Sequence, residues 1–367
     1  MMQLFIEPMD VWLFRDGKPF DAQSDHRARS LFPPYPSVMQ GVIRSQHLVL
    51  NKGNVDLTDQ TAITAFIGDD KDYKGLRLRG PFIAKKNQTN GEVMRYYPIP
   101  ADASPSAGGY KALHPKSRVS VSKVITSAPE ELEMLFWPAG KPSKKELGEW
   151  MTEQELLKCL GEETATAEKT SRLFAYENHF GIGRDDATRT TKRQFLYEVD
   201  FIRPCKNVGL YVEVDGYNGW AERGVMRIGG EGRGAAYEII GAPALPSLAQ
   251  KFPEGKLPTR FKIYFATPTY FKNGWLPESW SKFFDGEVKL VAAAVNRYES
   301  VGGFDWTKKP ADAQKPARRY VPAGSVYYFE SNGTAKLKND VLEMNAIADE
   351  GAQIGFGQIF IQEVNHV

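Results

Sequence analysis

Cysteine and histidine are scarce: the 367 residues include two cysteines and five histidines. Cys159 and Cys205 form no disulfide framework, so a reduced, cytoplasmic protein is expected. Neither cysteine lies at metal-ligand spacing from another ligand, and four of the histidines are scattered: His47, His114, His179 and His366. A metal site is therefore poorly supported, and no cofactor is expected.

Long hydrophobic runs are also missing. The best candidate, 290–295, is far shorter than the roughly 20 apolar residues that span a bilayer. Residues 1–8 lack a basic segment, and the apolar run at the start of the chain is interrupted by Glu7 and then by Asp10. We interpret this start as a strand rather than a signal peptide, and we expect no membrane partner.

The chain has almost no excess of one charge, with 47 basic and 45 acidic side chains and a net charge of +2. Bulk electrostatics therefore do not indicate nucleic acid, and any such site must come from local clustering of arginine and lysine. Hydrophobic residues (42%) and aromatics (12%) are sufficient for real cores, and the length favours two domains.

Three motifs lie close together near the start of the chain. They read Phe-Arg-Asp-Gly-Lys-Pro-Phe at 14–20, Phe-Pro-Pro-Tyr-Pro-Ser at 32–37 and Gly-Val-Ile-Arg-Ser at 41–45. Proline cannot continue a helix backwards, so the prolines of the second motif set the start of a helix over about 36–50. The polar residues between the first two motifs include a cluster of His26, Arg27 and Arg29.

The start of this helix is the informative part. Ser37 and Gln40 match a Ser-x-x-Gln capping box, and the N–H groups of the first turn would form an anion site. Arg44 would add a full charge, because helical side chains lean toward the N-terminus. Gly41 and Ser45 would let a ligand approach closely. The alternative is an ordinary capped helix with a surface arginine.

A glycine- and arginine-rich segment follows in the middle of the chain. It begins at His179, carries Arg184, Arg189, Lys192 and Arg193, and has little apolar content. Such a segment cannot bury itself, so it should project as a hairpin or long loop between strands at 172–176 and 195–202. Its basic run is either an RNA contact or a solvated loop.

Two further glycine motifs need separate interpretations. The turn at 227–234, which begins with Arg227, lacks a clear strand before it and a helix after it, so it is no dinucleotide fingerprint. Gly355-Phe356-Gly357 enters a strand and is no P-loop, although it allows close backbone approach. Phe356 either packs in the core or stacks on a ligand. Arg319 ends a basic, proline-broken segment at 315–319.

Each half of the chain mixes strands with a few short helices. This pattern favours an α+β protein in which a ferredoxin-like unit is used twice. A stretch rich in proline, glycine and lysine at 243–258 suggests the boundary. We expect one domain at 1–250, with an insertion at about 101–170 and a projecting hairpin at about 179–195. The second domain covers 251–367 and contains the terminal glycine-rich loop.

The motifs together resemble a known family. In addition to the three motifs near the start, the series contains Gly229-Gly-Glu231, Thr267-Pro268, Gly274-Trp275, Gly302-Gly303, Pro322-x-Gly-Ser-Val326 and Gly355-Phe-Gly357. It is similar to the Cmr3 family, the third Cmr subunit of type III-B CRISPR effector complexes, within the RAMP superfamily. The similarity extends from end to end, with Lys18 standing where arginine is common. The insertion at 101–170 contains none of these motifs.

The resemblance implies two ferredoxin-like, RRM-related domains that face each other across a cleft, and a non-catalytic role in antiviral defence. It implies RNA-binding to the 5′ handle of the crRNA, and pairing with the large Cas10-type Palm-domain subunit and with a backbone Cmr subunit. Target RNA would be contacted indirectly, and a nucleotide at the partner interface is compatible with it. The segment 179–195 would be a thumb-like hairpin that bends the guide.

The residues expected to contact RNA come from the segments near the start, the middle and the end of the chain. They are Arg15, His26, Arg27, Arg29, Ser37, Arg44, Ser45, His179, Arg184, Arg189, Lys192, Arg193, Arg227, Arg319, Gly355, Phe356 and Gly357. Backbone contacts and stacking of splayed bases are how proteins hold such RNA.

Two other classes of function remain open from the residues. One is a metal-independent endoribonuclease that processes CRISPR repeats, in which His26 would activate a 2′-hydroxyl while Arg27 and Arg29 hold the phosphate. The other is a scaffold that touches only protein, with Trp275, Trp280, Trp306 and the tyrosines at 327–328 as interface anchors.

The His26 alternative gives a first prediction. Repeat RNA incubated with the purified chain should stay intact, because an assembly subunit holds its RNA without cutting it. Gel analysis of the RNA checks this. Cleavage that disappears in His26→Ala would establish the endoribonuclease instead.

Overall fold

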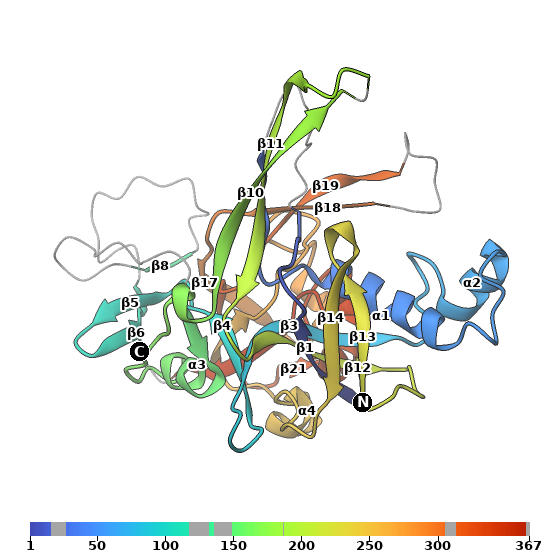
Figure 1. Cartoon of the computed structure of the whole chain (residues 1–367). Coiled ribbons are helices and arrows are strands. Elements are labelled where there is room, and N and C mark those ends of the chain that lie inside the picture. Colours follow the sequence, from blue (N-terminus) through green and yellow to red (C-terminus); the bar gives the residue numbers. More distant parts are fainter. Residues whose placement is uncertain (16–26, 117–131, 136–148, 186, 305–312, 365–367) are drawn as a thin grey trace. The chain divides into compact units, whose positions relative to one another are not determined.

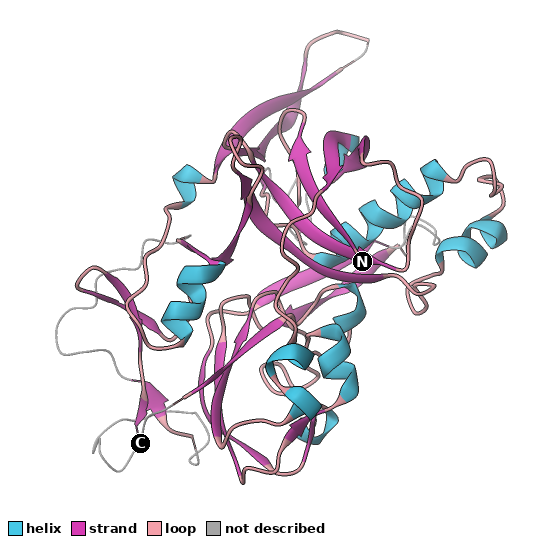
Figure 2. Ribbon diagram, turned by 90° about the horizontal axis from the view of Figure 1, so that it is seen from below, coloured by secondary structure: helices cyan, strands magenta, loops and turns pink. Residues whose placement is uncertain are grey.

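The computed structural model describes residues 1–15, 27–116, 132–135, 149–185, 187–304 and 313–364. Strands dominate and helices are few (Figure 2), so the expected mixture of strands and short helices is confirmed. The chain divides into two compact units that interleave along the sequence. Unit 1 comprises Met1–Val93, Ser171–Ala242 and Ser300–Arg318, and unit 2 comprises Met94–Thr170, Pro243–Glu299 and Arg319–Val367. The linear division at residue 250 stays a prediction.

Unit 1 is built on an antiparallel sheet whose strands lie in the order β13-β14-β1-β12-β3 (Figure 1). Its strands are β1 (Met2–Pro8), β3 (Arg77–Lys86), β12 (Val208–Asp215), β13 (Arg223–Ile228) and β14 (Arg233–Ile239). Leu4 of the central strand β1 lies opposite Val212 on one side and Ile239 on the other. Because Leu4 and Val212 are fully buried, their burial specifies the register.

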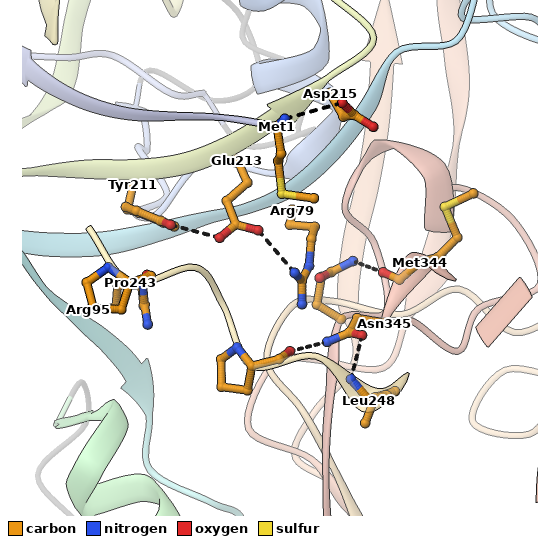
Figure 3. Close-up of polar contacts among 12 residues, drawn as sticks. Met1, Arg79, Arg95, Tyr211, Glu213, Asp215, Pro243, Leu248, Met344 and Asn345 are labelled. Carbon is orange, nitrogen blue, oxygen red and sulfur yellow. Dashed lines mark hydrogen bonds and ion pairs between the residues drawn. The ribbon is translucent and has the colours of Figure 1, made fainter. Parts of the chain in front are cut away.

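A buried carboxylate joins β12 to β3. Glu213 is 1% exposed, and it accepts hydrogen bonds from Arg79 Nη1 at 3.1 Å and from the Tyr211 hydroxyl at 2.8 Å (Figure 3). A buried charge without such partners would be costly, so this contact fixes the pairing of the two strands.

The helix predicted at 36–50 is confirmed as α1 (Pro36–Leu50), which is followed by α2 (Gln60–Ile67). The expected capping box is wrong: Tyr35 is the N-cap, and no side chain caps the helix. Pro36 needs no N–H partner and fits the first helical position, so the helix starts one residue before Ser37. Met39, Val42 and Ile43 form its buried face.

A separate sheet in unit 1 has the order β10-β11-β2. Its strands are β2 (Arg27–Ala28), β10 (Phe174–Arg184) and β11 (Thr191–Pro204). β10 and β11 form an antiparallel hairpin, and β2 pairs in parallel with β11 at Glu198 and Val199.

Unit 2 contains a four-stranded antiparallel sheet in the order β17-β20-β15-β22. Its strands are β15 (Arg260–Phe265), β17 (Val288–Ala294), β20 (Val326–Ser331) and β22 (Ile359–Glu363). Ile263 in β15 lies opposite Tyr327 and Ile361, and all three side chains belong to a large buried cluster rich in phenylalanine.

Shorter elements complete the chain. They are β4 (Val93–Pro98), β5 (Ala103–Ser106), β6 (Gly109–Ala112), β7 (Pro115–Lys116), β8 (Met134–Leu135), β9 (Trp150–Thr152), α3 (Glu153–Leu160), α4 (Leu248–Lys251), β16 (Phe284–Asp285), β21 (Lys336–Leu337) and α5 (Asn339–Met344). The strands β18 (Glu299–Phe304) and β19 (Gln314–Tyr320) form a two-stranded ribbon. Each of these strands contains residues assigned to both units, because the division falls after Glu299 and after Arg318.

The two main sheets share one strand order. When the strands β1, β3, β12 and β14 are numbered along the chain, their spatial order is 2-3-1-4, and β13 extends that sheet beyond β14. The strands β15, β17, β20 and β22 give the same 2-3-1-4 order. Each unit therefore repeats one arrangement of antiparallel strands.

A buried ion pair lies within unit 2. Lys262 Nζ is 3.3 Å from Asp102 Oδ2, and the two side chains are 1% and 0% exposed. The Tyr328 hydroxyl donates to the same carboxylate oxygen at 2.5 Å. Burial, together with the charge of Asp102, raises the pKa of Tyr328, so its hydroxyl stays protonated and remains a donor.

Replacing Lys262 tests this pair. Lys262→Met should lower the free energy of unfolding by about 3–5 kcal/mol, because it leaves the buried charge of Asp102 uncompensated. Urea denaturation of the full chain measures the change. The double variant Lys262→Met/Asp102→Leu should recover most of the loss, since it removes both charges. A single variant as stable as the wild type would contradict this account.

Candidate nucleic-acid interface

The β10–β11 hairpin carries many exposed residues on β10. It runs from the pair Phe174–Pro204 to the pair Arg184–Thr191, with a bulge after Ile182. In Figure 1 it extends away from β1, β3 and β12 of the same unit. The segment 179–195 lies within this hairpin.

One face of β10 carries exposed apolar side chains. Tyr176, Phe180 and Ile182 occupy alternate positions, which point to the same side of a strand, and they are 52%, 70% and 57% exposed. Exposed apolar side chains gathered on one face indicate a binding surface. None of these three residues is among those expected to contact RNA, although their separation by four and two positions can be read from the sequence.

The other face of the hairpin is closed by an aromatic ring. Tyr197 lies across Gly181, and a Cβ atom at position 181 would be only 2.1 Å from Tyr197 Cζ. A larger residue at position 181 would have to displace this ring, which covers the backbone of the hairpin.

The outer end of the hairpin carries cations. Arg184 and Arg189 are exposed, and neither has a carboxylate partner among the described residues. Asp185 serves the turn, since its carboxylate accepts from the N–H groups of Thr188 at 2.9 Å and Ala187 at 3.0 Å. Lys192 and Arg193 lie on β11, but their side chains fall outside the described set.

At its base the hairpin uses Arg27 as a structural contact. The guanidinium donates to both oxygens of Asp200 at 3.2 Å and lies 3.6 Å from Glu198. These contacts, led by the hydrogen bond to Asp200, raise the pKa of Arg27. Arg27 therefore joins β2 to β11, and it would have to release Asp200 to hold a phosphate.

His179 is also engaged. Its Nε2 atom lies 2.7 Å from Glu177 Oε1, and Glu177 receives a bidentate contact from Arg203. Hydrogen bonds from Arg203 and then from His179 hold the pKa of Glu177 at about 2. Arg203 reaches Asp10 as well, at 3.2 Å. This network ties β10, β11 and the end of β1 together.

Three segments of unit 1 meet at Phe14. The Phe14 N–H donates to Ser30 Oγ at 3.2 Å, and its carbonyl accepts from the Leu31 N–H at 2.9 Å. Leu13, the residue before Phe14, accepts through its carbonyl from the Gly230 N–H at 2.7 Å. The junction brings together segments that carry three exposed arginines from the expected set: Arg15, Arg29 and Arg227.

Buried rings lie beneath this junction. Phe32 contacts Trp12, Phe14 and Phe174, with ring centroids 6.0, 6.3 and 4.8 Å away. Because Phe174 begins β10, the cluster connects the start of the hairpin to the first segment of the chain.

The start of α1 differs from the expected anion site. The N–H groups of Val38 and Met39 already donate to the Tyr35 carbonyl. Arg44 donates through Nη2 to the carbonyl of Gly68, the residue that ends α2, and lies 5.7 Å from the Tyr73 ring. Arg44 thus holds α2 against α1, while Ser37 is partly exposed and Ser45 is exposed.

In unit 2 the glycine-rich loop has a packed centre. Phe356 is 3% exposed and its ring lies 5.1 Å from that of Tyr320, so it packs rather than presenting a free face. Gly355 accepts from Thr267 Oγ1 at 2.7 Å, and the Gly357 N–H donates to Pro268 at 2.9 Å. Arg319 is exposed and stacks on Tyr298, which is not among the expected contacts.

The remaining expectations concern His26, a metal site and a membrane span. His26 lies outside the described residues, as do residues 16–25. Among the residues that the structure describes, no three histidine, cysteine, aspartate or glutamate side chains gather as a metal site. No helix in the described part of the chain is long and apolar enough to cross a membrane.

A family model for a class of CRISPR-associated proteins matches residues 4–364 of this chain. That model is described as CRISPR-associated protein (Cas_Cmr3), and the chain belongs to this family. The resemblance stated from the motifs is confirmed. The comparison with curated proteins finds no match.

Solved structures with similar chains have low sequence identity. One is the cryo-EM structure of the type III-B Cmr-beta bound to cognate target RNA, at 16% identity and a TM-score of 0.46, covering 98% of this chain and 96% of that chain. Another is the Csm3-Csm4 subcomplex of the type III-A interference complex, at 14% identity and a TM-score of 0.38, covering 100% of both chains.

The turn that holds the junction gives a prediction with a matched control. Gly229 has φ 71° and ψ −164°, a conformation largely restricted to glycine, and a Cβ atom there would meet the Leu13 carbonyl at 2.4 Å. Gly229→Ala should lower the free energy of unfolding by about 2–3 kcal/mol. At Gly241 a Cβ atom would meet nothing within 4 Å, so Gly241→Ala should be nearly neutral. Equal urea midpoints for the two variants would contradict the proposed close approach.

Proposed function

We propose that this chain is a non-catalytic subunit of a type III-B RNA-guided effector complex and grips the 5′ handle of the crRNA. The observation that carries the proposal is the exposed β10–β11 hairpin, on which Arg184 and Arg189 lack carboxylate partners among the described residues. Membership of the Cas_Cmr3 family supports the assignment to this complex.

The fold part of the proposal is a pair of ferredoxin-like domains. The shared 2-3-1-4 order of antiparallel strands supports it, because that order is typical of the ferredoxin-like arrangement. Helix α1 connects β1 to β3 in the first unit, and α5 lies between β20 and β22 in the second.

The physics of RNA handles fits the hairpin. Guanidinium groups attract phosphates, and exposed apolar or aromatic side chains accept unstacked bases. The hairpin combines both: cations at its outer end, and Tyr176, Phe180 and Ile182 along one face. Arg15, Arg29 and Arg227 add charge around its base. In this proposal the backbone of the guide follows the cations while the exposed side chains separate its bases.

The partners are part of the same proposal. The chain pairs with the large Cas10-type Palm-domain subunit and with a backbone Cmr subunit, and it meets target RNA only through the guide. Any nucleotide would bind at the interface with the large subunit.

Removing the hairpin cations tests RNA binding. The triple variant Arg184→Gln/Arg189→Gln/Arg193→Gln should weaken binding of handle RNA about 10-fold or more. It should also reduce the slope of log K against log salt by about 2, since each lost phosphate contact on a single strand removes about 0.7. Fluorescence anisotropy at several salt concentrations measures both quantities.

A matched control removes the same charge elsewhere. Lys52, Lys71 and Lys111 are exposed and lie outside the hairpin, so replacing all three by glutamine should leave the slope nearly unchanged. If both triple variants behave alike, general charge and not the hairpin holds the RNA. If the wild-type chain shows no salt-dependent RNA affinity, the scaffold function that touches only protein is correct.

A further inference from the structure

Tyr298 and Arg319 form an exposed stacked pair in unit 2. The Arg319 guanidinium carbon lies 4.8 Å from the centroid of the Tyr298 ring, and the tyrosine remains 47% exposed. Tyr298 directly precedes β18, and Arg319 is the second-last residue of β19. The pair therefore consists of two planar groups held against each other at the surface.

Arg319 differs from three other exposed arginines in its partners. Arg203 contacts the carboxylate of Glu177, Arg223 that of Glu238, and Arg260 that of Glu330. Within the described part of the chain, Arg319 has no carboxylate partner, and neither has the exposed Arg297 beside Tyr298. One guanidinium without a carboxylate partner in the described part of the chain thus contacts the exposed ring, and a second, that of Arg297, belongs to the residue before it in the sequence.

The pair is positioned by the packed centre of the glycine-rich loop. Tyr320, which follows Arg319, lies 5.3 Å from the Tyr270 ring and 5.1 Å from the buried Phe356 ring. These contacts fix the end of β19 and with it the backbone of Arg319. A preorganised surface loses little conformational entropy on binding.

We infer that Tyr298 and Arg319 form a stacking platform for a base of single-stranded RNA, with Arg297 and Arg319 contacting the neighbouring phosphates. Aromatic rings and guanidinium planes stack on any base, and exposed cations at the ring and at the adjacent residue fit a polyanionic backbone. A protein partner would have to supply acidic groups to match the same charges. The inference rests on the proposed RNA binding and adds a contact in unit 2 that lies outside the hairpin.

The test uses the full chain with a labelled, unstructured oligouridine and fluorescence anisotropy. Tyr298→Leu should weaken binding about 5- to 100-fold, the range for loss of one base-stacking contact, while the salt slope stays unchanged because no charge is removed. Tyr298→Phe keeps the ring and should bind within about twofold of the wild type. Arg319→Lys keeps the charge but not the plane, so it should fall between them.

A second arm separates stacking from charge. An abasic ribose-phosphate oligomer of the same length should bind the wild type and Tyr298→Leu equally. Because Tyr298 is exposed, thermal unfolding of all variants should match the wild type.

The outcomes separate the two proposals. If the wild type binds RNA and Tyr298→Leu binds equally well, the platform is wrong while the proposed function stands. If Tyr298→Leu instead loses assembly with the partner subunits at unchanged RNA affinity, the surface is a protein contact and the platform is again wrong. If the wild type shows no salt-dependent RNA affinity, the proposed function fails and the platform with it.

Discussion

The site in unit 1 depends on how the β10–β11 hairpin is held at its base. Trp12 and Ile202 exchange two backbone hydrogen bonds, of 2.9 and 2.8 Å, and the rings around Phe32 bury the same junction. A long two-stranded hairpin is marginal in water without such support. Because its base is packed and paired, the outer part can stay exposed and keep its arginines available.

The arginines of the chain divide according to their partners. Arg27 and Arg44 are used internally, one by Asp200 and the other by the Gly68 carbonyl, although the sequence places both among candidate RNA contacts. Arg184, Arg189 and Arg319 have no carboxylate partner within the described residues. A chain with a net charge of only +2 can bind a polyanion where such unpaired groups gather.

Much of the fold could be predicted from the sequence, because hydrophobic alternation and proline position are local signals. The helix at 36–50 and the strand-rich character are examples. The candidate site was harder to predict from the sequence. The partner of Arg27 lies 173 residues away and that of Arg44 lies 24 away, so no local pattern reveals that either is engaged. The stack of Tyr298 and Arg319 is likewise a tertiary contact, whereas the capping box failed because Pro36 starts the helix first.

The central claim is that this chain holds the guide handle through its hairpin and does not cut it. The most direct measurement is photo-crosslinking of a guide RNA to the full chain in the assembled complex, followed by mass spectrometry of the linked peptides. The account predicts links between intact handle nucleotides and residues 174–204, with further links around Arg15, Arg29 and Arg227. Handle nucleotides that link only to other subunits, with none on this chain, would contradict it.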